Sequence, residues 1–269
     1  MAEFVDLLSQ KLVSFCMSRR QIDDAYASWQ GLPPPKQIER AIELRNRAYD
    51  LFKRAHRKTS RNGEFGEVIT YLLIEHVLNA PQLVSKMSLK TSPQMPVHGS
   101  DGIHFSYDAA TGGLTLLWGE SKCYGSVSAA LGEAVSSVAE NLQDGKMGQE
   151  LFLVKEHGDL SVLSDAAREA VLSFLDPWNE NYNRRVDASV ILIAFDFNRF
   201  AALQGIKAAE VEATFQEALR AELEACATRL DGHLRRVGIE RHSLDVFFLP
   251  VPSVDDLRTR FQDRIGWAA

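Results

Sequence analysis

The stretch "GSDGIHFSYDAATGGLTLLWGESKCYG", residues 99–125, decides the fold. "GIHFSYD" alternates as a strand, "AATGG" has the composition of a turn, and "LTLLWGESK" returns as a second strand. Asp101 opens the first strand, and Glu120 and Lys122 close the second. An antiparallel hairpin brings these strand ends together, and residues two apart on a strand point to the same face. We therefore expect Asp101, Glu120 and Lys122 to meet at one end of the hairpin.

Two carboxylates at hydrogen-bonding distance from each other repel unless a cation lies between them. Oxygen ligands of this kind suit Mg²⁺ or Mn²⁺. Lys122 would then help to activate or orient a water molecule, or would stabilise the charge that develops on a phosphate. An acid on the preceding helix would complete the site, and "GEFGE" supplies Glu64 and Glu67. We prefer Glu67, which we expect inside a helix at 67–78, over Glu64 near the cap, where it would favour the helix dipole.

The rest of the chain predicts an α/β fold with a mixed sheet and helices on both faces. "DASVILIAFDF" at 187–197 is a β-branched run typical of a strand buried on both faces. We expect residues 1–60 to form a helical segment packed on the core and residues 61–269 to form the main domain. The expected helices are 2–16, 35–58, 67–78, 126–145, 164–177, 209–238 and a short one after 252, and the expected strands are about 83–89, 102–108, 114–122, 187–197 and 242–252.

Composition excludes some classes of protein. The 269 residues carry a net charge of −6, which argues against binding nucleic acid by bulk charge. The sequence contains no run of about 18 apolar residues, so we expect no membrane span. The N-terminal "MAEFVDLLSQKLVSFC" has acids within its apolar pattern and predicts a helix rather than a signal peptide. Three widely spaced cysteines indicate reduced thiols, and hence a cytoplasmic protein.

One segment, "LFKRAHRKTSRNG" at 51–63, has basic residues and no acid. Its position beside the predicted acidic site makes a phosphate-contacting patch a candidate, and a solvated helix face is the alternative. The basic residues of the segment are Lys53, Arg54, Arg57, Lys58 and Arg61.

Two histidines, His98 and His104, flank Asp101. A zinc site would need a further Cys or His nearby, and none is present, so we expect a structural or substrate-adjacent role for His104. Ser121, between Glu120 and Lys122, is a further candidate for the site.

The order of these motifs resembles the PD-(D/E)XK nuclease superfamily, which has the restriction-endonuclease-like fold. The matching residues are Glu67 on a helix, Asp101 at the start of the hairpin, and "ESK" at 120–122. Ser100 stands where the family name has a proline. The resemblance implies a Mg²⁺- or Mn²⁺-dependent phosphodiesterase acting on DNA, with Glu67, Asp101 and Glu120 as ligands and Lys122 assisting the attacking water.

Within this superfamily, three stretches resemble the HamA family, the nuclease component of Hachiman antiphage defence: "NGEFGEVITYLLIEHVL", "HGSDGIHF" and "LWGESKCYGSVSAAL". The resemblance covers about residues 60–260. It implies a DNA-damaging endonuclease in a hetero-complex with a superfamily 2-type helicase, HamB. The chain has no G-x-x-x-x-G-K-[ST] stretch with which to drive translocation itself.

The alternative is a catalytically silent nuclease fold that binds and regulates a helicase. In that case Glu120 and Lys122 would form a simple salt bridge that closes the hairpin. Asp101 would only cap a turn.

Overall fold

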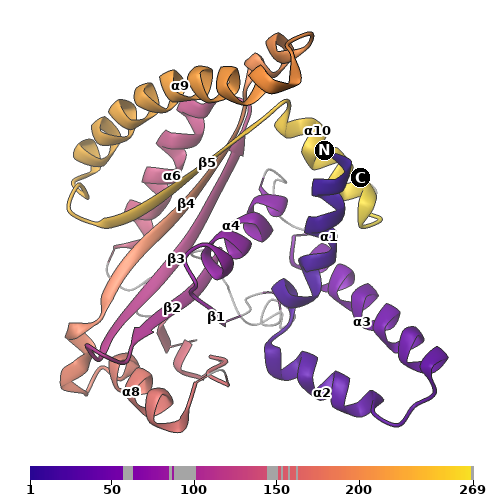
Figure 1. Ribbon diagram of the computed structural model, residues 1–269. Helices are drawn as coiled ribbons and strands as arrows, with labels where there is room; N and C mark the ends of the chain where they lie inside the picture. The colour runs from indigo at the N-terminus through magenta and orange to yellow at the C-terminus, as the bar shows by residue number, and fades with distance from the viewer. Residues whose placement is uncertain are drawn as a thin grey trace.

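The computed structural model describes residues 1–56, 63–84, 87, 101–143, 151–152, 154–156, 158–161 and 163–267. Its centre is a mixed sheet in the order β1-β2-β3-β4-β5, with helices on both faces (Figure 1). This arrangement, with its N-terminal helical segment, confirms the predicted fold class. The strands are β1 (Gln82–Val84), β2 (Gly102–Asp108), β3 (Gly113–Tyr124), β4 (Val186–Asp196) and β5 (Ser243–Val251).

The helices largely follow the sequence prediction. They are α1 (Ala2–Cys16), α2 (Arg19–Trp29), α3 (Pro34–Ala55), α4 (Glu64–His76), α6 (Val127–Asn141), α8 (Asp165–Leu175), α9 (Ala208–Val237) and α10 (Val254–Arg264), with 3-10 turns η1 (Glu180–Arg184) and η2 (Asn198–Leu203). None of these described helices is both long and apolar enough to cross a membrane.

The hairpin of β2 and β3 forms as predicted. The two strands pair antiparallel from Gly102 opposite Gly119 to Asp108 opposite Gly113. The Asp108 carboxylate closes the turn by accepting from the backbone N–H of Ala110, and Gly112 has a φ of 65°, which favours glycine. β3 then pairs parallel with β4, and β4 pairs parallel with β5.

Strand β4 is buried on both faces, as the sequence predicts. Leu192 and Ala194 lie in a hydrophobic cluster with residues of α1, α4 and α10. Ile191 and Ile193 lie in a second cluster with α6 and α9 on the opposite face. The sheet therefore has α4 on one side and α6 on the other, and β3, which carries Glu120 and Lys122, contacts both helices (Figure 1).

The N-terminal segment contains one helix that the sequence prediction missed, α2. It begins at a capping box in which Ser18 and Gln21 bond each other's backbone N–H groups. Both signals were visible in the sequence, the capping box and an apolar series at helical spacing made of Ile22, Ala25, Tyr26 and Trp29. In Figure 1, α2 and α3 lie side by side and extend away from the sheet.

Most predicted boundaries differ from the observed ones by a few residues, as at the start of α4 and in β1. The helix expected at 67–78 begins earlier, at Glu64, because the carbonyl of Gly63 already accepts from the N–H groups of Gly66 and Glu67. The strand expected near 83–89 is β1, Gln82–Val84, and most of the remaining positions lie outside the described residues. The proposed domain edge near residue 60 also falls outside them, within 57–62.

Candidate catalytic site

Asp101 lies at the open end of the hairpin and is held there by β3. Its backbone N–H donates to the carbonyl of Gly119 at 2.7 Å. Its Oδ2 accepts from both the N–H of Ser121, at 2.7 Å, and the Oγ of Ser121, at 2.6 Å. Ser121 therefore fixes the Asp101 carboxylate across the end of β3, which gives this candidate residue a positioning role.

Glu120 and Lys122 lie together on the opposite side of the same strand. The Nζ of Lys122 is 2.7 Å from Oε1 of Glu120, and both side chains are largely buried. Their neighbours on β4, Ile191 and Ile193, face α6, and Ser137 of α6 forms a side-chain hydrogen bond with Glu120. The two residues therefore pair as the period of the strand predicts.

Helix α4 reaches this end of β3 because of a glycine. A Cβ at Gly66 would lie 2.6 Å from Sγ of Cys123 and 3.0 Å from Oγ of Ser121. No other residue fits there without movement, so the first turn of α4 rests directly on β3. This close approach brings Glu64 and Glu67, both in that first turn, to the site. Carboxylates are stabilised at the N-terminus of a helix by its dipole.

The two glutamates of α4 differ in what they contact. Oε1 of Glu67 is 2.9 Å from Nε2 of His56, and the charge of Glu67 acts on both Asp101 and Glu120. Glu64 is only 4% exposed, its Oε1 has no hydrogen-bond partner among the described residues, and its charge acts on Cys123. Glu67 is therefore the acid of α4 whose charge acts on Asp101 and Glu120, and the choice of Glu67 over Glu64 as a ligand stays a prediction.

The site has more negative than positive charge. Burial raises the pKa of Asp101 well above its usual value, and the neighbouring Glu67 and Glu120 raise it further against the hydrogen bonds from Ser121. Burial also raises the pKa of Glu120, although Lys122 and Ser137 oppose this. For Lys122, burial lowers the pKa, but the attraction of Glu120 and Asp101 is stronger, so its pKa is raised. Lys122 is therefore an ammonium at neutral pH.

The donor set has the chemistry that a divalent cation requires. The charge of Glu67 raises the pKa of both Asp101 and Glu120, and the charge of Glu120 raises the pKa of Asp101. The buried Oε1 of Glu64 adds an oxygen that has no hydrogen-bond partner among the described residues. In this structure Ser121 contacts the carboxylate of Asp101, Lys122 contacts that of Glu120, and His56 contacts that of Glu67. Within the described ranges, no three acidic, histidine or cysteine side chains are already arranged around one metal position.

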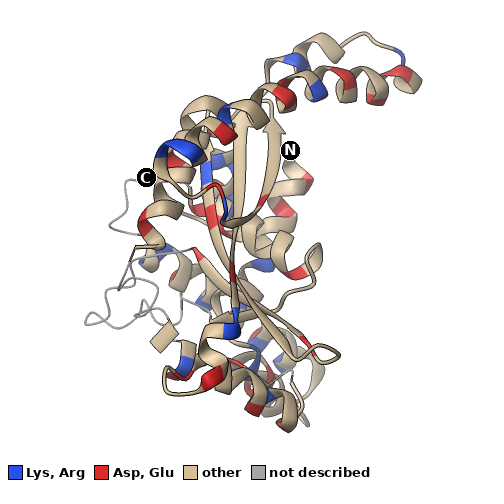
Figure 2. Cartoon of the chain, turned by 90° about the vertical axis from the view of Figure 1, so that its left-hand side faces the viewer, with Lys and Arg blue, Asp and Glu red and all other residues tan. Residues whose placement is uncertain are grey.

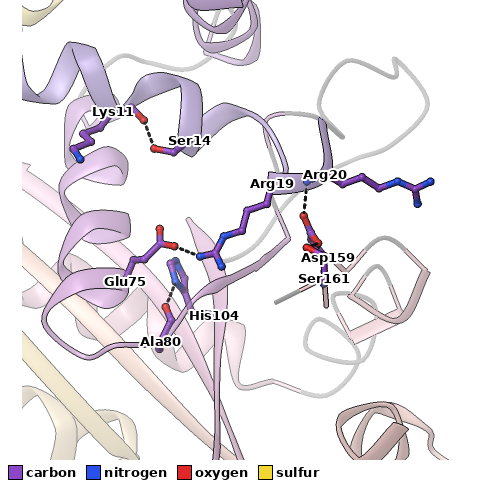
Figure 3. A network of polar contacts seen from close by, with 9 residues as sticks. All are labelled: Lys11, Ser14, Arg19, Arg20, Glu75, Ala80, His104, Asp159 and Ser161. Carbon is purple, nitrogen blue, oxygen red and sulfur yellow. Dashed lines mark hydrogen bonds and ion pairs between the residues drawn. The ribbon is translucent and has the colours of Figure 1, made fainter. Parts of the chain in front are cut away.

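His104 has a structural environment. It is fully buried in β2, and its Nδ1 donates to the carbonyl of Ala80 at 2.9 Å. Burial lowers its pKa to about 4, so the ring is neutral. Figure 3 shows it beside the ion pair of Arg19 and Glu75, which joins α2 to α4. It lines a narrow crevice with Asp101, and its described hydrogen bond is to the Ala80 carbonyl.

The basic segment is only partly described. Lys53 lies 3.2 Å from Asp50, one turn earlier on α3, and Arg54 is exposed. Arg57, Lys58 and Arg61 lie outside the described residues, as does His98. Figure 2 shows basic and acidic positions interspersed along the helices. The phosphate-contacting patch therefore stays a prediction.

Three residues of the site were not singled out from the sequence. Ser137 bonds Glu120 from α6, Gly66 allows α4 to contact β3, and His56 contacts Glu67 from the end of α3. The second glycine of "GEFGE" was a visible signal for a close approach. His56 lies within a basic segment, and no local pattern distinguished it.

Comparison with known proteins identifies the family. Neither curated proteins nor solved structures gave a match. A family model described as HamA matches residues 1–265, so it includes the N-terminal helices as well as the stretches around the candidate site. The chain belongs to the HamA family and is a component of the Hachiman antiphage defence system.

Proposed function

We propose that this protein is a metal-dependent DNA endonuclease, the nuclease effector of its defence system. The observation that carries the proposal is a cluster of three acids and one lysine at the open end of the β2–β3 hairpin, with Glu67 on α4 and with Glu120 and Lys122 on the face of β3 toward α6. Glu67 and Glu120 both raise the pKa of Asp101, and Lys122 is 2.7 Å from Glu120. A protein that used this hairpin only as scaffold would have no need for a cluster that burial makes unfavourable.

Glu67, Asp101 and Glu120 are the residues that would hold Mg²⁺ or Mn²⁺. Such an ion, when bound, supplies a more acidic water and neutralises charge on a phosphate. The contacts of the carboxylates indicate how the chain would orient them toward such an ion. Ser121 orients Asp101 through two donors on one oxygen, which leaves Oδ1 of Asp101 for another partner.

Lys122 acts as a charge and a donor in this proposal. Because its raised pKa keeps Nζ protonated, the group has no lone pair with which to accept a proton from water. Nζ would instead donate to the attacking water or to a phosphate oxygen and stabilise the charge that develops there. Glu120 holds Nζ at this position.

The partner and setting belong to the same proposal. A net charge of −6 disfavours spontaneous binding to DNA, so we propose that a HamB-like helicase in the cytoplasm forms a hetero-complex with this chain and presents the DNA. The affinity of the isolated chain for DNA, measured at increasing salt, tests this. A shallow slope is expected, and a steep slope would contradict it because it would reveal many phosphate contacts.

Cleavage of plasmid DNA by the co-purified complex tests the activity. Wild type should cut with Mg²⁺ and should stop with a chelator, and Glu120→Ala and Lys122→Ala should each lose most of the activity. Glu217→Gln, an exposed acid on α9, is the matched control and should cut like wild type. Equal activity in all four proteins would reject this site. No cutting by the complex under conditions in which the helicase is active would instead support the alternative, a non-catalytic module that regulates the helicase.

A further inference from the structure

His56 connects the N-terminal helices to the acidic site. It follows the last residue of α3, and its side chain is only 1% exposed. Its Nδ1 is 2.9 Å from the carbonyl oxygen of Phe52, and its Nε2 is 2.9 Å from Oε1 of Glu67. One imidazole therefore bonds the backbone of α3 on one side and a site carboxylate on α4 on the other.

The orientation of the ring is fixed by these contacts. A carbonyl oxygen only accepts, so the hydrogen of this bond is on Nδ1. The hydrogen bond between Nε2 and Oε1 of Glu67 then uses a second proton, carried either by Nε2 or by the Glu67 carboxyl. The ring also packs against Phe52, with centroids 4.5 Å apart, and lies near Trp267, at 6.2 Å. Rotation of the ring would break both hydrogen bonds and disturb this aromatic packing, so His56 is a rigid support.

Glu67 is a residue that benefits from such a support. A glutamate has three rotatable side-chain bonds, and its carboxylate must be held before it can share a cation with Asp101 and Glu120. The backbone of Glu67 is fixed by its bond to Gly63. The contact with His56 fixes one end of the carboxylate as well.

We propose that His56 is a positioning residue: it holds the Glu67 carboxylate in the orientation in which it shares the site with Asp101 and Glu120, and so sets the affinity for a divalent cation. This inference rests on the proposed function. Partners that orient metal ligands typically change metal affinity by about 10–100-fold when they are removed. The N-terminal segment would then contribute to the site, although the carboxylate and lysine motif lies entirely after it.

Two amide variants separate the two hydrogen bonds of His56. In His56→Asn, the amide nitrogen takes the position of Nδ1 and can still bond the Phe52 carbonyl, but it cannot reach Glu67. In His56→Gln, the amide nitrogen takes the position of Nε2 and can still donate to Glu67. His56→Phe keeps the aromatic ring and removes both nitrogens. His242→Gln is the control, because His242 bonds Ser189 on β4 and none of the site acids.

The measurement is the binding of Mn²⁺ to the full chain without DNA, followed by the spin-resonance signal of free Mn²⁺. His56→Asn and His56→Phe should bind about 10–100-fold more weakly than wild type, and His56→Gln should stay close to wild type. Circular dichroism verifies that each variant is folded. If His56→Phe does not fold, the two amide variants still decide the question.

Asp101→Asn in the same titration separates the two proposals. If Asp101→Asn weakens Mn²⁺ binding and His56→Asn does not, the positioning role is wrong and the metal site stands. If His56→Gln binds as weakly as His56→Asn, the contact with Glu67 is not what matters, and the inference is also wrong. If wild type binds no Mn²⁺, or Asp101→Asn binds like wild type, the proposed function fails and the inference fails with it.

Discussion

Gly66→Ala tests whether close packing of α4 on β3 builds the site. Helix propensity alone predicts that this change stabilises the protein, since alanine is favoured over glycine in helices by about 1 kcal/mol. The structure predicts the opposite sign. The added Cβ would lie 2.6 Å from Sγ of Cys123, whereas non-bonded atoms prefer about 3.5–4.0 Å. The helix and strand would have to separate by about 1 Å.

The expected magnitude follows from these two effects. Forcing a methyl group into a packed core costs about 1–3 kcal/mol. The contacts at Gly66 involve Cys123, which is buried, and Ser121, which is held by Asp101, so neither can move freely. After the gain in helix propensity, we expect a net loss of about 1–2 kcal/mol. For a chain of this size that corresponds to a fall of roughly 2–8 °C in melting temperature.

Urea unfolding followed by circular dichroism measures the change, with Gly232→Ala as the matched control. Gly232 lies in the long helix α9, and a Cβ there would meet nothing within 4 Å, so its substitution should stabilise the protein by up to about 1 kcal/mol. Adding Cys123→Ala to Gly66→Ala removes the closest contact and should recover about 1 kcal/mol relative to the sum of the single changes. If Gly66→Ala is as stabilising as Gly232→Ala, the packing argument is refuted.

Three further predictions concern charge. The 2.6 Å hydrogen bond from Ser121 lowers the pKa of Asp101, so Ser121→Ala should raise that pKa. The acidic limb of the pH–rate profile for cleavage should then move to higher pH. Asp101→Asn should abolish cleavage, yet its melting temperature should equal or exceed that of wild type. The pKa of Asp101 is raised on folding above its ordinary value of 3.8, so ionising it costs stability as pH rises above that value, and the difference between the two proteins should grow with pH. The pH dependence of stability that His104 causes has the opposite sign. Folding lowers the pKa of His104 from 6.5 to about 4, so the free energy of unfolding of the wild type should fall by up to about 3 kcal/mol as pH falls through that window. His104→Asn, which can still bond Ala80, should show a smaller loss in urea unfolding at pH 5 compared with pH 7.

The sequence was sufficient for the sheet and for the acids carried on it. Successive side chains of a strand point to opposite faces, so the sequence pattern indicates which faces are buried. Alternation, as at 102–108 and 114–122, indicates one buried face, and an apolar run, as at 187–197, indicates two. The same period predicts that Glu120 and Lys122 pair. The hairpin register then requires Asp101 to lie at the same end, and the structure shows it there.

The supports of the site could not be predicted in this way. Ser137, His56 and Gly66 act on the acids from three different helices, and each contact depends on how a helix is placed on the sheet. Local patterns do not specify that placement. Helix α2, by contrast, could have been predicted, because Ile22, Ala25, Tyr26 and Trp29 recur at helical spacing after its capping box.

The distribution of these supports bears on how the protein is organised. Residues of α1 share one hydrophobic cluster with α4 and with the C-terminal helix α10, so both ends of the chain pack behind the helix that carries Glu67. His56 extends this connection to the carboxylate itself. A family match that begins at residue 1 is what this packing leads one to expect, because a motif confined to residues 67–122 would not by itself require the N-terminal helices. The motif residues provide the charges of the site, and the N-terminal helices help to hold them in place.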